Sequence, residues 1–257
     1  MSEPMELIKA TANQFGGLVL DKDDLPSDAA EFNERLRYSL DVWRREGFKV
    51  VWFEAVLALA ALIPAAVENG FTFHHSAEGY VMMTIRLEDD AFIPPYATHY
   101  IGAGGVVLNE KRDLLVVSER FRRDKSRPYW KLPGGALHPG EHLADGVLRE
   151  VYEETGVRAK FDALVCFRHW HGYRYGKSDI YFICRLRPLS QEIDMDTFEI
   201  DACQWMPVEE YLASEFVGDF NKQIVRAALE SPGLPQSWVE GYSNPVTHEF
   251  FMPSIAG

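Results

Sequence analysis

Three glutamates in one short segment are the residues of this chain best suited to chemistry. Residues 134–157 read GGALHPGEHLADGVLREVYEETGV. On a helix that advances about 100° per residue, Glu150, Glu153 and Glu154 fall within an arc of about 100°. Like charges at these spacings repel by a few tenths of a kcal/mol per pair, and Arg149 supplies a single positive charge against them. A bound divalent cation is the simplest explanation for the arrangement.

The same charge run has a plainer interpretation, an amphipathic helix with a solvated acidic face. That interpretation does not explain Gly135 before the helix, Gly156 after it, or the order Arg149-Glu150. The segment resembles the Nudix box, G-x5-E-x7-R-E-U-x-E-E-x-G-U with U aliphatic, and it matches every fixed position. On this motif the chain is identified as a member of the Nudix hydrolase superfamily.

The resemblance implies a metal-dependent enzyme that cleaves the diphosphate of a nucleoside diphosphate linked to another moiety, such as ADP-ribose or NADH. A diphosphate is inert because its anionic oxygens repel a nucleophile, so catalysis requires charge neutralisation and an activated water. Mg²⁺ or Mn²⁺ held by oxygen ligands can supply both. The alternative is a non-catalytic regulator that senses a nucleotide and binds a partner. The complete acidic set favours the enzyme.

The same resemblance assigns roles within the box. It implies that Glu150, Glu154 and Glu153 bind the metal, together with the carbonyl oxygen of Gly134. Arg149 is expected to orient a glutamate. Sequence, however, does not fix the general base. Glu199, upstream of Trp205, lies where some members place an acidic residue, but it reads equally well as a solvated loop carboxylate. Asp201 and Glu192 are further candidates.

Substrate contacts are expected from Gly135, Glu141 and Trp130. Glu141 precedes the helix, where it either caps the N-terminus or supports Arg149, and the helix dipole favours an acidic group there. Trp130 either stacks on a base or packs in the core. Three more aromatic residues are candidates for stacking, with packing as the alternative: Phe167, Trp170 and Tyr173.

The chain of 257 residues fits one to two domains. Its pattern changes at Pro94-Pro95, which predicts an N-terminal α+β domain over residues 1–95, a Nudix domain over 96–230 and a C-terminal tail over 231–257. In the first domain we expect helices over 29–46 and 54–69, the second split by Pro64, and strands over 48–52 and 80–87.

The second domain is predicted to be an α/β/α sandwich, with strands on both sides of the acidic helix. Apolar runs predict the strands, and the turn-forming residues 109–113 join the first two. Two further helices follow the last strand. The expected strands cover 100–108, 114–120, 161–170, 178–186 and 202–206, and the helices 208–214 and 221–230.

Outside the box the resemblance narrows to one subfamily. Residues 70–75, 177–179 and 204–207 resemble plant ADP-ribose/NADH pyrophosphatases and the animal fibroblast growth factor antisense Nudix protein. This implies that the N-terminal domain resembles half of an acetyltransferase-like fold. The plant proteins tend to carry threonine in place of Gly134, so their substrate preference does not transfer directly.

Two weaker motifs favour structural roles. His74 and His75 are adjacent, and neighbours on a strand point to opposite faces, so packing or hydrogen bonding is favoured over metal binding. Gly102-x-Gly104-Gly105 is similar to a dinucleotide loop, but it lies at the start of a strand and not at a strand-to-helix turn.

Composition limits partners and location. A net charge of −13 argues against a broad nucleic-acid surface. The sequence has no uninterrupted apolar run of membrane-spanning length, so we expect no membrane span. Residues 1–10 lack the basic segment and apolar run of a secretory signal, so we do not expect secretion. Three cysteines without metal-ligand spacing indicate reduced thiols and a cytoplasmic protein. The apolar run over 50–63 predicts packing on the Nudix domain or on a second subunit, which would give a homodimer.

Overall fold

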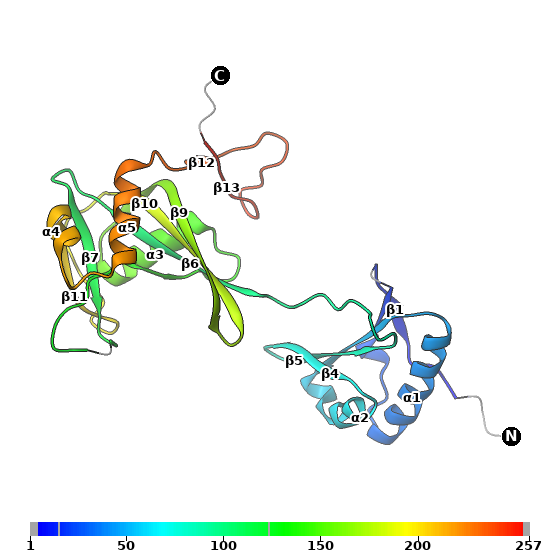
Figure 1. The fold of residues 1–257 in the computed structure, drawn as a ribbon. Coiled ribbons are helices and arrows are strands. Elements are labelled where there is room, and N and C mark those ends of the chain that lie inside the picture. Colours follow the sequence, from blue (N-terminus) through cyan, green and yellow to red (C-terminus); the bar gives the residue numbers. More distant parts are fainter. Residues whose placement is uncertain (1–4, 15, 123, 254–257) are drawn as a thin grey trace. The chain divides into compact units, whose positions relative to one another are not determined.

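The computed structural model describes residues 5–14, 16–122 and 124–253. The chain divides into two compact units, Met1–Ala97 and Thr98–Gly257 (Figure 1). The first unit ends two residues after residue 95, the boundary that Pro94-Pro95 indicates in the sequence. Within the described residues, no helix is both long and apolar enough to cross a membrane.

The first unit is built on a mixed sheet of five strands in the order β1-β2-β3-β5-β4. The strands are β1 (Ala10–Ala12), β2 (Gly17–Leu20), β3 (Val50–Val56), β4 (Thr72–Ala77) and β5 (Tyr80–Arg86). Two helices pack against it, α1 (Ala29–Arg45) and α2 (Ile63–Glu68). The carboxylate of Asp28 begins α1 by accepting hydrogen bonds from the backbone N–H groups of Ala30 and Glu31.

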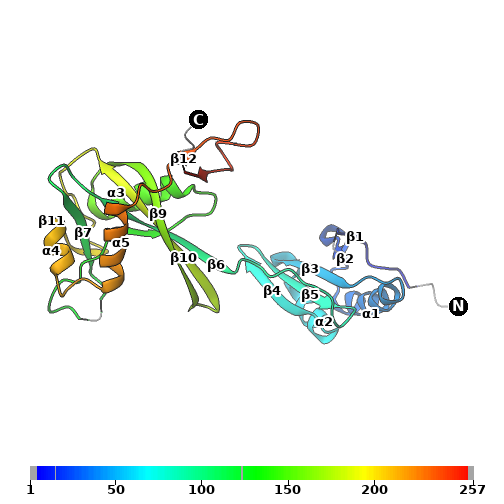
Figure 2. The same cartoon turned by 45° about the horizontal axis from the view of Figure 1, so that its top comes forward.

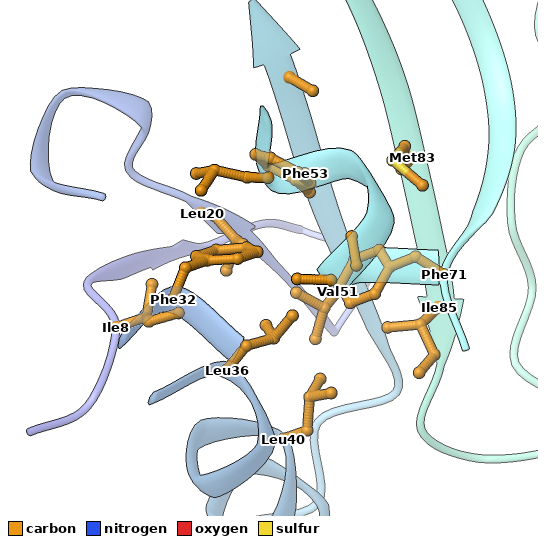
Figure 3. Packing of buried hydrophobic residues seen from close by; sticks show 14 of the residues in the cluster. Ile8, Leu20, Phe32, Leu36, Leu40, Val51, Phe53, Phe71, Met83 and Ile85 are labelled. Atoms are coloured by element: carbon orange, nitrogen blue, oxygen red, sulfur yellow. The ribbon is translucent and has the colours of Figure 1, made fainter. Parts of the chain in front are cut away.

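The core of this unit lies between α1 and the sheet. Phe32 and Leu36 of α1 meet Val51 and Phe53 of β3 and Met83 of β5, and all five are fully buried (Figure 3). Alternate residues of β3 point to this core, as the period of two in a strand requires. The α+β class expected of the unit is therefore present, while its likeness to an acetyltransferase half-fold stays a prediction.

The helix predicted over residues 54–69 is wrong in its first half. The strand β3 continues through Glu54 to Val56, because Val56 pairs with Tyr80 of β5. A 3₁₀ helix, η2 (Leu57–Leu62), follows, and α2 then begins at Ile63 with Pro64 in its first turn. Proline is tolerated there because the first N–H groups of a helix have no partner within the helix.

The two adjacent histidines lie on the same side of the sheet, contrary to simple strand alternation. A β-bulge between Phe73 and His75 inserts one extra residue opposite β5. The Nδ1 atoms of His74 and His75 are 2.7 Å apart, and His75 Nε2 lies 3.1 Å from the Tyr80 hydroxyl. The hydrogen-bonding role that the sequence favours for this pair is confirmed.

The second unit holds a sheet in the order β8-β6-β10-β9 and a separate two-stranded ladder of β11 and β7. Its strands are β6 (His99–Val107), β7 (Asp113–Glu119), β8 (Gly134–Ala136), β9 (Ala159–Arg174), β10 (Lys177–Pro188) and β11 (Ile200–Pro207). The parallel pair β6 and β10 is central, and Figure 2 shows β7 and β11 side by side away from the tip of the long β9–β10 hairpin. Both hairpin strands are longer than predicted.

Helices cover both faces of these strands, which confirms the predicted α/β/α sandwich. They are α3 (Leu143–Thr155), α4 (Val208–Ala213) and α5 (Asp219–Glu230). Along β6, Val107 points to the core beneath α3, whereas Val106 points to the core beneath α4 and α5. On β7, Leu115 likewise points to the core beneath α3 and Leu114 to the core beneath α4 and α5.

The segment expected as a tail is instead folded onto the second unit. Leu234 exchanges backbone hydrogen bonds of 2.8 and 2.9 Å with Leu164 of β9. A short hairpin of β12 (Gln236–Ser237) and β13 (Phe250–Phe251) follows. The Phe251 ring lies 5.3 Å from the ring of Phe161, so residues as far as 251 add to the core beneath α3.

Candidate active site

The acidic helix α3 forms because apolar and charged positions alternate with helical period. Leu143, Val147 and Val151 recur at intervals of four and are buried. Gly156 ends the helix in the left-handed conformation, with φ of 72°, and its N–H donates to the Tyr152 carbonyl. The box therefore lies on a helix that is held against the sheet by its apolar face. Glu150 and Glu154 lie at the edge of that face, where Glu154 is itself buried, and Glu153 lies further towards solvent.

Arg149 is the centre of the carboxylate array. Its Nε and Nη2 atoms donate to the two oxygens of Glu141 at 2.7 and 2.9 Å. Its Nη1 atom donates to Glu150 and Glu153, each at 2.9 Å, and Nη2 also reaches the Ala136 carbonyl at 3.1 Å. These carboxylates raise the pKa of Arg149, mainly through the bond to Glu141. Arg149 is therefore bonded to three glutamates at once, and its role in orienting them for catalysis stays a prediction.

The glycine turn allows the backbone to approach the glutamates. The N–H of Gly134 donates to Glu154 Oε2 at 2.8 Å. A Cβ atom on Gly135 would lie 2.5 Å from Glu150 Oε2, so a side chain there would displace that carboxylate. Gly134 has φ of 149° and lies against the Ala103 carbonyl of β6, which also excludes a side chain. The turn and the helix form one closely fitted unit.

Glu154 is the carboxylate of the site whose pKa is raised by burial. The residue is only 6% exposed, and burial raises its pKa to about 7. The Lys131 ammonium, 3.9 Å away, and the Gly134 N–H oppose this rise, while Glu150 adds to it. Lys131 also pairs with Glu119 at the end of β7. A buried, poorly solvated carboxylate next to a second carboxylate gains from a cation.

The three candidates for the general base lie in different surroundings. The Glu199 side chain is exposed, and its backbone carbonyl accepts from the N–H of Arg120, at the end of the β7–β11 ladder that also carries Glu119. Asp201 forms an ion pair of 2.8 Å with Arg122. Glu192 is exposed. Glu199 therefore keeps its place as the preferred candidate, since the ion pair engages Asp201.

The aromatic candidates fall into two groups. Trp130 is only 8% exposed and belongs to the core beneath α4 and α5. Of the two interpretations of Trp130, stacking on a base and packing in the core, this position fits core packing. Phe167 contacts Phe182, with ring centroids 5.8 Å apart, but it is still 63% exposed. Trp170 is 49% exposed, and its ring centroid lies 5.2 Å from that of Tyr173. Trp170 thus remains available to a ligand.

Arg168 gathers aromatic side chains beside the glycine turn. Its guanidinium lies 5.2 Å from the ring centroid of Trp170, 5.6 Å from that of Tyr181 and 5.5 Å from that of Phe220 on α5. The buried carboxylate of Asp179 pairs with its Nη2 atom. Among the described residues, its Nε atom is buried without a hydrogen-bond partner. We call Arg168, Trp170, Tyr181 and Phe220 the Arg168 platform.

Two family models match the chain. One, described as a Nudix hydrolase domain, covers residues 8–87, and the other, described as a NUDIX domain, covers residues 98–228. The second alone spans half of the chain and contains the whole acidic helix. The chain belongs to the Nudix hydrolase family.

Relatives of known name agree with this assignment. Nudix hydrolase 8 of Arabidopsis thaliana is 41% identical over 82% of this chain. The matched part is 58% of the length of that relative. Nudix hydrolase 2 of the same plant is 40% identical, covering 83% of this chain and 77% of its own. The human protein called nucleoside diphosphate-linked moiety X motif 6 is 33% identical, covering 86% and 72%.

A solved Nudix hydrolase from Nitrosomonas europaea is 22% identical to this chain. The match covers 55% of this chain and 98% of that one, with a TM-score of 0.46.

Nudix hydrolases generally depend on a divalent metal, and the donor types here suit one. Glu150, Glu153 and Glu154 offer hard oxygen ligands. Over the described part of the chain, however, no three His, Cys, Asp or Glu side chains already converge as a metal site. Arg149 holds Glu150 and Glu153, so these carboxylates are grouped by a cation of the protein itself. The buried Glu154 beside them, 3.9 Å from the Lys131 ammonium, offers a further oxygen ligand for a metal.

Sequence reasoning missed Lys131, Glu119 and Tyr181. Lys131 stands three residues before Gly134, outside the fixed positions of the box. A signal for Tyr181 was present in Gly102 and Gly104, because glycines two apart in a strand indicate a close approach. Cβ atoms on these glycines would lie 2.9 and 2.8 Å from the Tyr181 side chain, so they make room for that ring and not for a dinucleotide.

Glu141 provides a test of the Arg149 array that needs no substrate. The bond to Arg149 lowers the pKa of Glu141 from 4.5 to about 2, so its contribution to stability is present above pH 4.5 and is lost as pH falls towards 2. We predict that Glu141→Gln lowers the free energy of unfolding at pH 7 by about 1–3 kcal/mol. Urea denaturation from pH 7 to pH 3 should show the difference from the unmutated protein shrinking below pH 4.5. A difference independent of pH would contradict this.

Proposed function

We propose that this protein is a metal-dependent Nudix hydrolase that cleaves a nucleoside diphosphate linked to a second group, such as ADP-ribose or NADH, and releases a nucleoside monophosphate. The observation that carries the proposal is the buried Glu154 carboxylate, held by the Gly134 N–H beside Glu150. A stable fold gains little from a buried carboxylate with so few partners. Such a group is favoured where a cation and an anionic substrate meet.

The residues proposed to hold Mg²⁺ or Mn²⁺ are Glu150, Glu153 and Glu154, with the carbonyl oxygen of Gly134. When bound, the metal neutralises the diphosphate and lowers the pKa of a water molecule that attacks phosphorus. Arg149 keeps Glu150 and Glu153 oriented from one side. Glu199 is proposed as the general base that removes a proton from the attacking water.

The Arg168 platform is proposed to receive the nucleoside. Tyr181 connects the platform to the carboxylates, since its phenol lies against the glycine turn. Burial raises the pKa of Tyr181, and the nearby charges of Glu154 and Glu150 raise it further. The guanidinium of Arg168 is positively charged and only partly buried, which suits an anionic oxygen. The exposed ring of Trp170 can stack on a base.

Hydrolysis is tested with a panel of ADP-ribose, NADH, coenzyme A derivatives and capped RNA, each with Mg²⁺ and with Mn²⁺. We predict turnover of at least one, with heavy oxygen from water recovered in the nucleoside monophosphate. Glu154→Gln should abolish turnover, at least about 10²-fold, because the metal loses a ligand. Glu209→Gln, a change at an exposed glutamate of α4, is the matched control.

Circular dichroism must show that both variants are folded. Near-normal turnover in folded Glu154→Gln would refute the metal assignment. Binding of the nucleotides without hydrolysis by the unmutated protein would favour the alternative, a regulator that senses a nucleotide. Hydrolysis confined to non-nucleotide diphosphates would leave the family assignment intact and remove the nucleoside from the proposal.

Substitution of Trp170 tests the platform separately. If a base stacks on this ring, Trp170→Ala should raise KM about tenfold and leave kcat nearly unchanged, because stacking contributes about 1–3 kcal/mol per base. Trp238→Ala is the control, since Trp238 is also exposed but lies in the C-terminal segment. An unchanged KM in the Trp170 variant would remove this residue from the nucleoside site.

We also propose that the protein is a cytoplasmic homodimer. Part of the apolar run over 50–63 stays exposed on the first unit, where Leu57 is 77% exposed. The three cysteines are free, as reduced thiols of the cytoplasm would be. Light scattering at micromolar concentration should give twice the chain mass, and fractionation should recover the protein with cytoplasmic markers. A monomer would contradict the proposed homodimer, and recovery in another fraction would contradict the cytoplasmic location.

A further inference from the structure

The first turn of the catalytic helix is capped by a residue from the far end of the chain. The carboxylate of Glu249 accepts from the backbone N–H of Leu143 at 2.8 Å and from that of Ala144 at 3.1 Å. These are the first two residues of α3, and Glu249 is 106 residues from Leu143 in the sequence. The residue at the N-cap position, His142, gives the helix no side-chain hydrogen bond within the described chain.

Glu249 is held in place by the C-terminal segment, residues 234–252. Its Oε1 atom also accepts from Gln236 Nε2 at 3.3 Å, across the β12–β13 hairpin. The ring of His142 donates from Nε2 to the Pro245 carbonyl at 2.9 Å, which ties the same segment to the start of α3. Since the NUDIX family model ends at residue 228, the cap lies outside the matched domain.

We propose that Glu249 is a positioning residue for hydrolysis, acting through the N-terminus of α3; this rests on the proposed function. The first N–H groups of a helix have no partner within it, and a carboxylate there satisfies them and interacts favourably with the helix dipole. Glu141 lies two residues before α3 and anchors Arg149, which in turn orients Glu150 and Glu153.

Loss of the Glu249 cap is therefore expected to affect metal binding through Glu141 and Arg149. If the first turn of α3 frays, the anchor at Glu141 becomes mobile and Arg149 holds Glu150 and Glu153 less firmly. The metal should then bind more weakly and turnover should slow. Contacts at the Arg168 platform come from β9, β10 and α5, not from the first turn of α3, so KM for the nucleotide should change little.

The full-length variants Glu249→Ala and Glu249→Gln test this proposal, with Glu240→Ala as the matched control from an exposed position of the same segment. For Glu249→Ala we expect a half-saturating Mg²⁺ concentration about tenfold higher and a kcat about tenfold lower, with KM within about twofold. Glu249→Gln keeps one acceptor oxygen and should lie between. The control should match the unmutated protein.

Two measurements need no turnover and keep the test separate from the proposed function. Hydrogen exchange at the Leu143 and Ala144 amides should accelerate in Glu249→Ala, and Mn²⁺ affinity measured by electron paramagnetic resonance should fall about tenfold. Faster exchange with unchanged metal affinity and unchanged kcat would show a merely structural cap and overturn the proposal. If Glu249→Ala does not fold, Glu249→Gln decides by the same criteria. An unmutated protein that binds Mn²⁺ but hydrolyses nothing would refute the proposed function alone.

Discussion

The bonds from Arg149 to Glu141, Glu150 and Glu153 are the constraint on which the site depends. Carboxylates on one edge of a helix repel, so without a cation between them they would spread into solvent. A single guanidinium joins two of them to each other and to Glu141 before the helix. Its planar fork suits several carboxylates at once, which an ammonium group could not match. The array is thus preorganised by the protein.

Close approach of backbone to side chains is the second requirement. Gly134 and Gly135 bring the turn to Glu154 and Glu150, and glycines of β6 admit the ring of Tyr181 from the other side. The sheet supplies a rigid base for both approaches, because Gly134 and Gly135 belong to β8, which pairs with β6. Gly134 and Gly135 lie on β8 and Arg168 lies on β9, at opposite edges of the sheet. Tyr181 of β10 lies between them, against Gly134 and near the Arg168 guanidinium, and so connects the carboxylates with the platform.

Local features of the sequence predicted much of this arrangement. The Nudix box placed a helix between Glu141 and Gly156, where α3 lies, and runs of apolar residues located the main strands of the Nudix domain. Errors arose where distant pairing decides. Glu54 is in a strand because β5 pairs beside it, although its alanine- and leucine-rich surroundings read as a helix. The bulge at His74 and the cap at Glu249 likewise depend on partners that no local pattern reveals.

The central claim is that the carboxylates grouped by Arg149 form a metal site with the buried Glu154. Anomalous diffraction from crystals of the unmutated protein grown with Mn²⁺ tests it most directly. The account predicts a manganese peak at coordination distance, about 2.0–2.2 Å, from oxygens of Glu150 and Glu154. Manganese found only elsewhere, or no peak at a saturating concentration while Arg149 keeps all its carboxylate partners, would contradict the account.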